Sequence, residues 1–483
     1  MSDARSTTAK NLLSSFLSEA GSSLDDAHAR TALPTERLAA LLSDERLLPT
    51  PREIEALCLA YFRPVEALVA YDPLPHTVAA LVAPLGVPLA GDKVQVTVVG
   101  LGNLGHVFLG LLSQHPELVV NGLAVRPDRA EAFGRAVKAQ GGVRVVRRDG
   151  EVLGKPHRVS ADPVEVIPGS HLVLFCLPSH VEPEVLARVA PHLPDGALLG
   201  SIPGPGGFHW AATRALEAAG KRAVVFGLAS IPWMCKSDEL GRVRVLGQKT
   251  ITGLAALPRE RASLAAEVMS SLLGLPVVDI QNFLQIILNP ANQLLHPAIT
   301  RDLFEGWDGR PLDEAPLFYE SISERAAETL ERMSDEILEL KAALLEGRPD
   351  LSLSAVLPID IAIRAAYGGD IADASSTRSI IATNRAYAGI RMPMVPLEGG
   401  LAPAFSSRFF TEDIPYGLVV LRGIADLVGV KMPATDEVLR WCQEKMGREY
   451  LRGGALSGAD VADSGAPSRY GITTLDGLVG QAG

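Results

Sequence analysis

Along residues 93–257, short runs of aliphatic and β-branched residues alternate with longer stretches whose apolar positions recur at helical spacing. Strands separated by segments long enough for a crossover helix predict a parallel sheet covered by helices on both faces. We therefore expect a doubly wound α/β domain over residues 93–280. The predicted strands lie in VQVTVV, VVNGLAV, HLVLFCL, ALLGSI and RAVVFGL, with further strand in RVRVLGQKTITGLAAL at 242–257.

Helical periodicity flanks this region on both sides. Before it, PTERLAALLSDERLL and PREIEALCLAYFRPVEALVAY carry apolar residues at helical spacing, and prolines close the segment. After it, residues 321–347 predict one long amphipathic helix, and Ser321 with Glu324 fits a capping box at its start. The expected organisation is an N-terminal helical segment (1–92), the α/β domain (93–280), an all-α domain (281–452) and a flexible, loosely packed tail (453–483).

Composition and charge narrow the class of protein. Apolar residues make up 47% of the 483 positions and charged residues 21%, which is the balance of a folded chain. The net charge of −11 argues against a general nucleic-acid binder and against a polybasic membrane surface. The four cysteines are too scattered for a disulfide framework or a zinc site, so no metal is expected. Because the chain shows neither a signal-peptide pattern nor an apolar run of membrane-spanning length, we expect a cytoplasmic protein.

The sequence VTVVGLGNLGHVF places Gly100, Gly102 and Gly105 in the spacing G-x-G-x-x-G between a predicted strand and a predicted helix. The glycine spacing alone is weak evidence, but between a strand and a helix it predicts the dinucleotide-binding loop of a Rossmann-type sheet. The glycines permit the turn, the approach of backbone to a pyrophosphate and the close packing of helix on strand, and the free N–H groups of the helix then face the anion. Cofactor contacts are expected from Gly100, Gly102, Asn103, Leu104 and Gly105, and from Pro178 after a later strand.

The end of the second strand of such a unit normally decides between NAD(H) and NADP(H). Arg126 stands there, where an acidic residue would bind a ribose hydroxyl, and Arg129 follows three residues later. Residues 126–158 hold nine Lys or Arg against four Asp or Glu, on a chain that is acidic as a whole. A guanidinium suits a 2′-phosphate, so NADP(H) is favoured. NAD(H) is the alternative if these arginines only form a solvated helix face.

His296 is the candidate proton carrier in the helical domain. It follows Asn292 by four residues in NQLLHP, so the two side chains share one helix face. A second sequence, RFFTEDIPYGL, places Glu412 and Asp413 before a proline and an apolar helix, and either carboxylate could hold the far nitrogen of the imidazole and fix its tautomer. The alternatives are a packed core histidine at 296 and an ordinary helix N-cap at Asp413.

Taken in order, these motifs resemble the opine dehydrogenases of the octopine and nopaline type. They recur from about residue 94 to about residue 450 of the 483. More distantly, the chain is similar to the dehydrogenases that complete opine metallophores such as staphylopine. The residues that carry the resemblance are GLGNLGH, IPWMCKSDELGRVRVLGQK (231–249), NPANQLLHP (289–297), TNRAYAG (383–389) and FTEDIPYGL (410–418).

The resemblance implies NAD(P)H-dependent reductive condensation of an amino acid, or another amine, with a 2-oxo acid through an imine. It places His296 on the catalytic histidine of the family, Asp413 on its acidic partner and Asn292 on the asparagine one turn earlier. It also places Arg385 of NRAY where an arginine can clamp a substrate carboxylate.

Three other histidines and one tyrosine are expected to contact the substrate or to pack locally. His180 follows a predicted strand end that faces the cleft, and Tyr416 lies in FTEDIPYGL, so both are expected to contact substrate. His106 in the glycine loop and His209 after PGPGG (203–207) are expected to pack locally.

Two features depart from the family. The helical segment before the sheet has no counterpart in typical members, and it could add an oligomer contact such as a homodimer, cover the cleft or bind a partner. The stretch 347–375 aligns least well and is expected to shape the amine pocket. Two other functions compete: a 2-hydroxy acid or ketopantoate-type NADP reductase with the same two-domain plan, and a non-catalytic dinucleotide-sensing protein. The sequence leaves the two substrates, the stereochemistry and the oligomeric state open.

Overall fold

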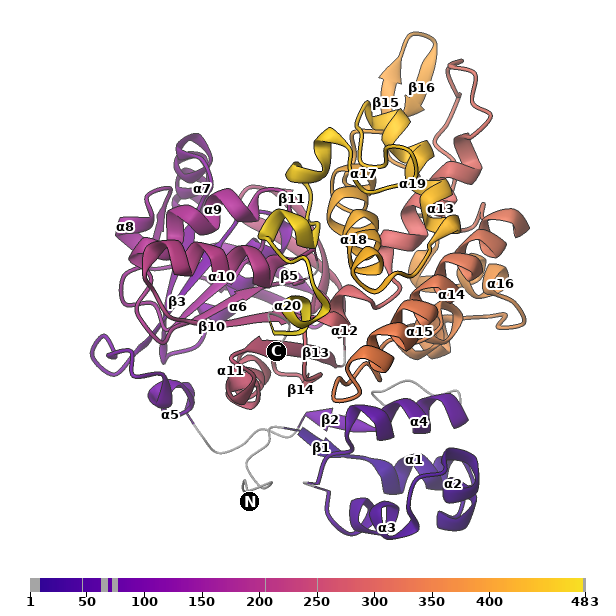
Figure 1. Cartoon of the computed structure of the whole chain (residues 1–483). Helices are drawn as coiled ribbons and strands as arrows, with labels where there is room; N and C mark the ends of the chain where they lie inside the picture. The colour runs from indigo at the N-terminus through magenta and orange to yellow at the C-terminus, as the bar shows by residue number, and fades with distance from the viewer. Residues whose placement is uncertain are drawn as a thin grey trace.

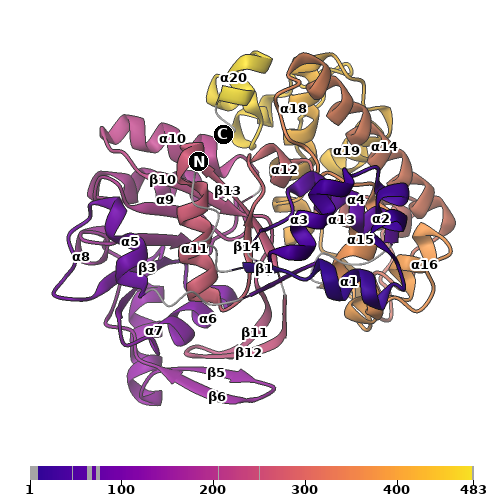
Figure 2. The same ribbon diagram turned by 90° about the horizontal axis from the view of Figure 1, so that it is seen from below.

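Three units make up the chain, in a computed structural model that describes residues 9–45, 47–61, 68–71, 77–204, 206–249 and 251–480. A half built on a sheet and a helical half lie side by side, and a small N-terminal unit lies beneath them (Figure 1). Seen from below, the N-terminal helices lie across the helical half (Figure 2). Among the described residues, no helix combines the length and the apolar character that crossing a bilayer requires.

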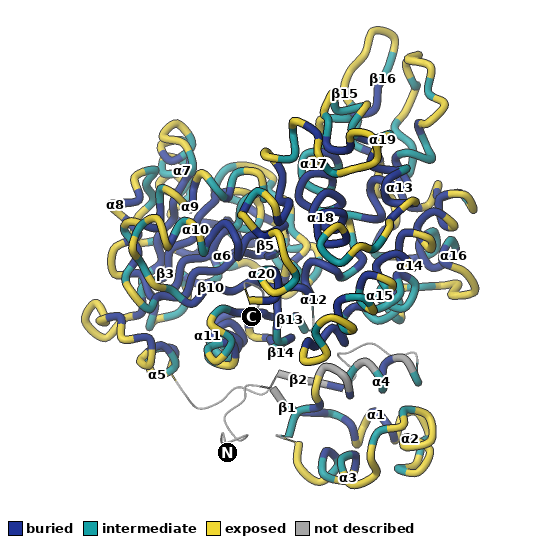
Figure 3. Tube along the Cα trace, viewed as in Figure 1, coloured by how far each residue is buried: buried dark blue, intermediate teal, exposed yellow. Residues whose placement is uncertain are grey.

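Eight strands form the main sheet, in the order β14-β13-β10-β9-β8-β3-β4-β7. All neighbours are parallel except β10 and β13. The central strands β8, β9 and β10 are buried along their whole length, because helices cover both faces (Figure 3). This arrangement confirms the predicted Rossmann-type sheet. The strands are β3 (Val94–Val99), β4 (Leu118–Leu123), β7 (Arg158–Ser160), β8 (Leu172–Phe175), β9 (Leu198–Ser201), β10 (Val224–Leu228), β13 (Thr252–Leu257) and β14 (Val277–Asp279), and the helices are α6 (Asn103–Leu112), α7 (Pro127–Gln140), α8 (Pro163–Val166), α9 (Glu182–Val189), α10 (Phe208–Ala219) and α11 (Ala262–Leu273).

A second sheet of four strands packs against α6, in the order β11-β12-β5-β6. The segment 242–257, expected to extend one sheet, is divided between two: the chain leaves the second sheet after Gln248 and joins the main sheet at Thr252. Periodicity alone gives no signal for this change, because both halves of the segment read as strand. The strands of the second sheet are β5 (Val143–Arg147), β6 (Gly150–Gly154), β11 (Trp233–Glu239) and β12 (Arg242–Gln248).

Helices α13, α14, α18 and α19 pack on one another to form the helical half. The predicted long helix is present as α14, but its N-cap is Ser323 rather than Ser321: the Ser323 hydroxyl accepts a hydrogen bond from the backbone N–H of Ala326 at 3.1 Å. The hairpin β15–β16 projects from this half (Figure 1), and its strand β15 is largely exposed whereas β16 is half-buried. The elements are α12 (Leu284–Ile287), α13 (Asn292–Phe304), α14 (Glu324–Gly347), α15 (Ile359–Tyr367), α16 (Thr377–Ala382), β15 (Met394–Leu397), β16 (Gly400–Pro403), α17 (Arg408–Thr411), α18 (Val419–Val428) and α19 (Pro433–Met446).

The N-terminal unit has a hydrophobic core of its own. Leu13, Phe16 and Leu38 belong to this small core, whereas Val78 and Val82 of the later helix α5 pack into the core of the main body. The change from one core to the other therefore falls between residues 71 and 78, before the boundary expected at residue 92. The elements of the N-terminal unit are β1 (Ala9–Asn11), α1 (Leu13–Glu19), α2 (Leu24–Thr31), α3 (Thr35–Ser43), α4 (Pro51–Tyr61) and β2 (Val69–Tyr71), and α5 (Val78–Val82) follows them on the main body.

Residues 459–480, which we term the C-terminal strap, are packed rather than loose. Ala466, Ile472 and Leu478 are buried, and the segment lies against α10 of the sheet half and α18 of the helical half. The prediction of a flexible tail differs from this structure for a physical reason. Small residues there allow backbone segments to approach closely: a Cβ on Gly465 would lie 2.4 Å from the carbonyl oxygen of Gly206.

Candidate active site

At the carboxyl end of β3, the chain turns on the glycine loop. Gly100 has a φ of 102°, and a Cβ there would lie 2.6 Å from the carbonyl oxygen of Cys176. A Cβ on Gly105 would lie 1.9 Å from the carbonyl oxygen of Gly100, so only glycine lets α6 approach the turn. The space beside Gly102, the N-cap of α6, is open. The loop thus offers bare backbone N–H groups at a helix N-terminus, an arrangement that fits a pyrophosphate.

His296 and Asp413 meet in the helical half. His296 is 7% exposed, and its Nδ1 lies 2.8 Å from Asp413 Oδ2 while its Nε2 lies 2.9 Å from the Tyr319 hydroxyl. The Asp413 side chain makes no cap bond to the π-helical turn that follows it, so it is not an ordinary N-cap. A carboxylate only accepts, so Nδ1 carries the proton and donates to Asp413, and the Tyr319 hydroxyl donates to Nε2.

Aromatic side chains enclose this pair. The ring of Phe409 stacks on His296 with centroids 3.7 Å apart, and Tyr387 stacks on Tyr319 at 4.2 Å. Burial raises the pKa of the Tyr319 phenol well above its ordinary value, and Tyr367 and Asp413 act in the same direction. Tyr319 is therefore a neutral donor to the imidazole. Sequence reasoning missed Tyr319 and Phe409, because nothing in residue type or spacing separates them from core aromatics.

Three residues expected near the substrate differ in where they point. Asn292 is exposed at the first position of α13, one turn before His296. The side chain of Arg385 is 71% exposed, and its guanidinium donates to the carbonyl oxygen of Gly369 at 2.6 Å and pairs with Asp370. The hydroxyl of Tyr416 lies 3.4 Å from the carbonyl oxygen of Asp463, so it faces the C-terminal strap.

Glu412, the neighbour of Asp413, joins the two halves. Its Oε1 accepts a hydrogen bond from the backbone N–H of Ser179 at 3.1 Å, in the loop that follows β8. Its Oε2 accepts from the guanidinium of Arg408 at 2.9 Å. Pro178 and the exposed His180 lie in the same loop as Ser179. The loop at the carboxyl edge of the sheet therefore touches the turn that carries Asp413.

Comparisons with known proteins point to one family. A family model, the α-helical domain of NAD/NADP octopine/nopaline dehydrogenase, matches residues 279–446, which include His296 and Asp413. The chain is 34% identical to octopine dehydrogenase of Pecten maximus over 396 residues, 80% of this chain and 98% of that protein. It is 31% identical to tauropine dehydrogenase of Arabella iricolor over 398 residues, 80% of this chain and 100% of that protein. The chain belongs to the opine dehydrogenase family.

The fold of this opine dehydrogenase agrees with that assignment. A structure of octopine dehydrogenase with NADH and L-arginine superimposes with a TM-score of 0.73 at 32% identity, covering 80% of this chain and 98% of that one. The protein is accordingly an NAD(P)-dependent oxidoreductase of the kind that joins an amino acid to a 2-oxo acid by reductive condensation. This result confirms the family expected from the motifs and leaves the 2-hydroxy acid reductase and the non-catalytic sensor without support.

At the dinucleotide end of the opine dehydrogenase, most of the predicted cations are paired. Arg126 precedes α7, and its 72% exposed side chain is bonded to Asp128 at 3.2 Å. Arg129 donates to the carbonyl oxygen of Leu101 in the glycine loop at 3.1 Å. The positive surface is therefore smaller than the residue count suggests. Other pairs are Arg135 with Glu131, Arg144 with Glu151, Arg147 with Asp149 and Arg158 with Glu165.

Asn103 and His106 tie the glycine loop to the second sheet. Asn103 Oδ1 accepts from the backbone N–H of Ser237 at 3.1 Å, so its side chain holds β11. His106 Nε2 accepts from the N–H of Gly241 at 3.1 Å, and Nδ1 donates to the carbonyl oxygen of Gly102 at 2.7 Å. Burial lowers the pKa of His106, and the neutral ring matches these two bonds. The local packing expected of His106 is confirmed.

Two other predicted residues also pack locally. The side chain of Leu104 is partly buried against the main core. His209 is fully buried and stacks on Phe283 with centroids 4.2 Å apart, as expected of a packing residue.

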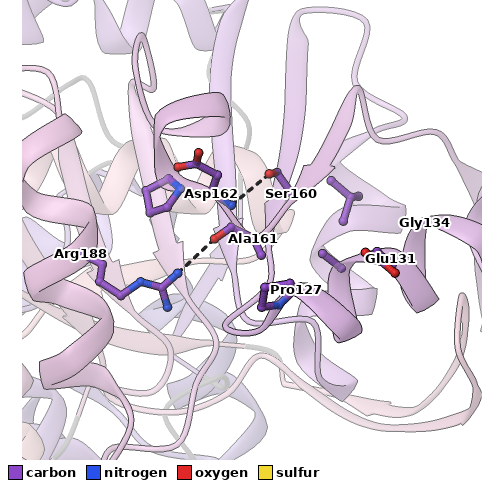
Figure 4. A pocket seen from close by; sticks show the side chains of 10 residues that line it. Pro127, Glu131, Gly134, Ser160, Ala161, Asp162 and Arg188 are labelled. Atoms are coloured by element: carbon purple, nitrogen blue, oxygen red, sulfur yellow. Dashed lines mark hydrogen bonds between the residues drawn. The ribbon is translucent and has the colours of Figure 1, made fainter.

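A hollow of about 640 Å³ lies beside α7 (Figure 4). At this hollow, the guanidinium of Arg188 joins two loops by donating to the carbonyl oxygens of Val125 and Ala161, both at 3.0 Å. Every lining residue belongs to the sheet half, so the hollow adjoins the dinucleotide end and not the pair of His296 and Asp413. The lining residues are Pro127, Ala130, Glu131, Gly134, Val159, Ser160, Ala161, Asp162, Pro163 and Arg188.

Proposed function

We propose that His296 moves the proton of imine formation, with Asp413 as the partner that fixes its tautomer. The Nδ1–Asp413 bond supports this role, because it leaves Nε2 as the basic nitrogen. Neutral His296 takes a proton from the substrate ammonium at Nε2 after the Tyr319 hydroxyl has moved off that nitrogen, so that the amine can attack the carbonyl carbon. The imidazolium then protonates the departing hydroxyl. The glycine loop would hold the pyrophosphate of a bound NAD(P)H, and that cofactor would supply the hydride that completes the secondary amine.

The oxo acid is proposed to be small, pyruvate being the first candidate, because an octopine dehydrogenase of the same fold has been solved with pyruvate. The deciding experiment follows oxidation of NADPH by the purified protein with pyruvate and a panel of amino acids. Oxidation is expected only when both substrates are present. Oxidation with the oxo acid alone would point to a 2-hydroxy acid reductase, and binding without turnover would point to a sensor.

Arg408 is proposed as the anchor for a substrate carboxylate. Its neighbour Phe409 stacks on His296, and its guanidinium is 81% exposed while Glu412 holds it at the junction of the halves. A guanidinium there can bind a carboxylate by two parallel hydrogen bonds. The side chain of Arg385, which the motif NRAY suggested for this role, is directed to Gly369.

Replacing Arg408 with alanine is expected to raise the KM for the oxo acid by about 10- to 100-fold, the size of one charged hydrogen-bonded contact. The matched control is Arg385→Ala, another exposed arginine of the helical half, which is expected to change KM less than about threefold. Steady-state kinetics with each substrate varied in turn measure both. A larger effect at Arg385 would restore the assignment made from the motif.

NADPH is proposed as the preferred cofactor. Support comes from Arg126, which follows β4 where the second ribose of a dinucleotide is normally read, and from Arg129 beside the glycine loop. A salt bridge as exposed as that of Arg126 with Asp128 is weak, so the guanidinium is available to a phosphate.

Arg126→Ala is accordingly expected to lower kcat/KM for NADPH by about 10- to 100-fold and to leave kcat/KM for NADH unchanged. Arg148→Ala, at an exposed position of the same basic stretch, is the control and should alter neither value. The two cofactors are compared at fixed, saturating substrate. Equal losses with both cofactors would assign Arg126 to the pyrophosphate or to folding instead of the 2′-phosphate.

The cytoplasm remains the proposed location, and a homodimer the proposed assembly. No disulfide joins any of the four cysteines, which suits a reducing compartment. The N-terminal unit, with its own core, is the candidate contact between two copies. Sedimentation of the full chain tests the dimer.

A further inference from the structure

Glu182 is a buried acid to which the chemistry above gives no role. It is the first residue of α9 and is 3% exposed. The Oγ of Ser201, at the end of β9, lies 2.5 Å from Glu182 Oε1 and 2.7 Å from the carbonyl oxygen of Pro203. A serine hydroxyl has one proton to give, yet both contacts are short enough to need one.

One distribution of protons satisfies both contacts. The carbonyl oxygen of Pro203 can only accept, so the hydroxyl proton of Ser201 goes there. The contact with Glu182 then takes its proton from the carboxyl group, which is therefore neutral. If Glu182 were ionised and received the serine proton, two oxygen lone pairs would face each other at 2.7 Å.

The surroundings of Glu182 favour the same state. Burial raises the pKa of Glu182 well above its ordinary value, and the charge of Glu412 adds to this. A proton received from Ser201 would act in the opposite direction, but the contact with Pro203 takes that proton. The titratable groups coupled to Glu182 by charge are Cys176, Glu412, Tyr416 and Tyr470, all of them acids. The dipole of α9 favours the anion, but it is the weaker effect at a fully buried carboxyl.

The three residues support the junction of the two halves. Pro203 opens the loop that contains Gly206, where a Cβ would lie 2.9 Å from Cβ of Tyr416. Tyr416 follows Asp413 by three residues on the same π-helical turn. We propose that Glu182 is a neutral positioning residue, which donates a hydrogen bond to Ser201 and so sets the loop after β9 against the turn that carries Asp413.

The first test compares three variants by steady-state kinetics. Glu182→Gln keeps an N–H donor that cannot titrate and is expected to retain kcat/KM within about threefold, whereas Glu182→Leu loses the donor and is expected to lose about tenfold or more. Glu184→Gln, at an exposed position of the same helix turn, is the control and should match the parent protein. Equal damage from Gln and Leu, or no damage from Leu, would overturn the proposal.

The second test needs no substrate, so it stands apart from the proposed function. A carboxyl with a raised pKa takes up a proton on folding at any pH between its ordinary pKa of 4.5 and the raised value. The parent protein then loses stability as pH rises through that window. Glutamine takes up no proton, so the Tm of Glu182→Gln minus that of the parent is expected to grow from about pH 5 to about pH 8.

A Tm difference that stays constant with pH would mean an ionised Glu182 in the fold and would sink the proposal. Infrared spectra at neutral pH give an independent reading. The carbonyl stretch of a protonated carboxyl is expected in the parent protein, with a component that is missing from Glu182→Gln. Both measurements use the conservative variant, so they remain decisive if Glu182→Leu does not fold.

Discussion

The variant His296→Ala is expected to lose about 10²- to 10⁴-fold in kcat while binding NADPH as tightly as the parent protein, because it removes the proton carrier and leaves the glycine loop untouched. The two features lie in different halves of the fold, so binding and turnover should separate cleanly. Turnover is measured from oxidation of NADPH with both substrates saturating. Cofactor affinity is measured by fluorescence titration without substrates.

Asp413→Asn extends the same prediction. An amide that donates to Nδ1 would force the proton onto Nε2 and remove the lone pair that the mechanism needs, so a loss of about 10²-fold or more in kcat is expected. His157→Ala is the control and should leave kcat unchanged, since His157 is exposed just before β7 and has no role in the proposed site. If His296→Ala kept turnover within a few-fold of the parent, the proton carrier would have to be sought elsewhere.

Gly105→Ala is expected to abolish cofactor binding and to destabilise the fold by about 1–3 kcal/mol, the usual cost of forcing a methyl group into a packed site. The new methyl group would lie 1.9 Å from the carbonyl oxygen of Gly100, and backbone cannot rotate away as a side chain can. Helix α6 must therefore shift from β3 and carry its free N–H groups out of position. Titration with NADPH and thermal unfolding measure the two effects.

The matched control for this substitution is Gly134→Ala, inside α7. Nothing lies within 4 Å of the added methyl group there, so the higher helix propensity of alanine should raise stability by up to about 1 kcal/mol. If alanine raises stability at position 134 and lowers it at position 105, the loss at Gly105 comes from crowding of the added methyl group. Normal NADPH affinity in Gly105→Ala would contradict the close approach of α6 to the turn.

Much of the fold could be predicted because its signals are local. A buried strand followed by the glycine spacing and a helix specifies the β3–α6 unit, since each glycine has a steric reason to be there. The division of residues 242–257 between two sheets could not be foreseen, because strand partners are chosen by tertiary packing. The C-terminal strap was misjudged for a related reason: small residues indicate both loose chain and close backbone packing, and only the neighbours distinguish the two.

The candidate site, too, could be predicted only in part. The hydrogen bond between His296 and Asp413 joins two short motifs 117 residues apart. Residue chemistry suggested a carboxylate from Glu412 or Asp413, and the resemblance to the opine dehydrogenases selected Asp413. Tyr319 and Phe409 complete the surroundings of the imidazole, but an aromatic residue in an apolar stretch carries no sign of its partner. The direction of the Arg385 side chain could not be predicted either. A motif gives the position of a residue along the chain but not where its side chain points.

The C-terminal strap also limits how this molecule can open. The chain passes from the sheet half to the helical half near residues 280–284, and the C-terminal strap returns to touch α10 of the sheet half. Rotation about the line through the chain crossing and the strap strains neither of these two links, and of the other contacts it must break the hydrogen bond between Glu412 and Ser179. Substrate should therefore be admitted by a hinge rotation. Atoms far from that line would move furthest, and atoms beside the C-terminal strap would hardly move.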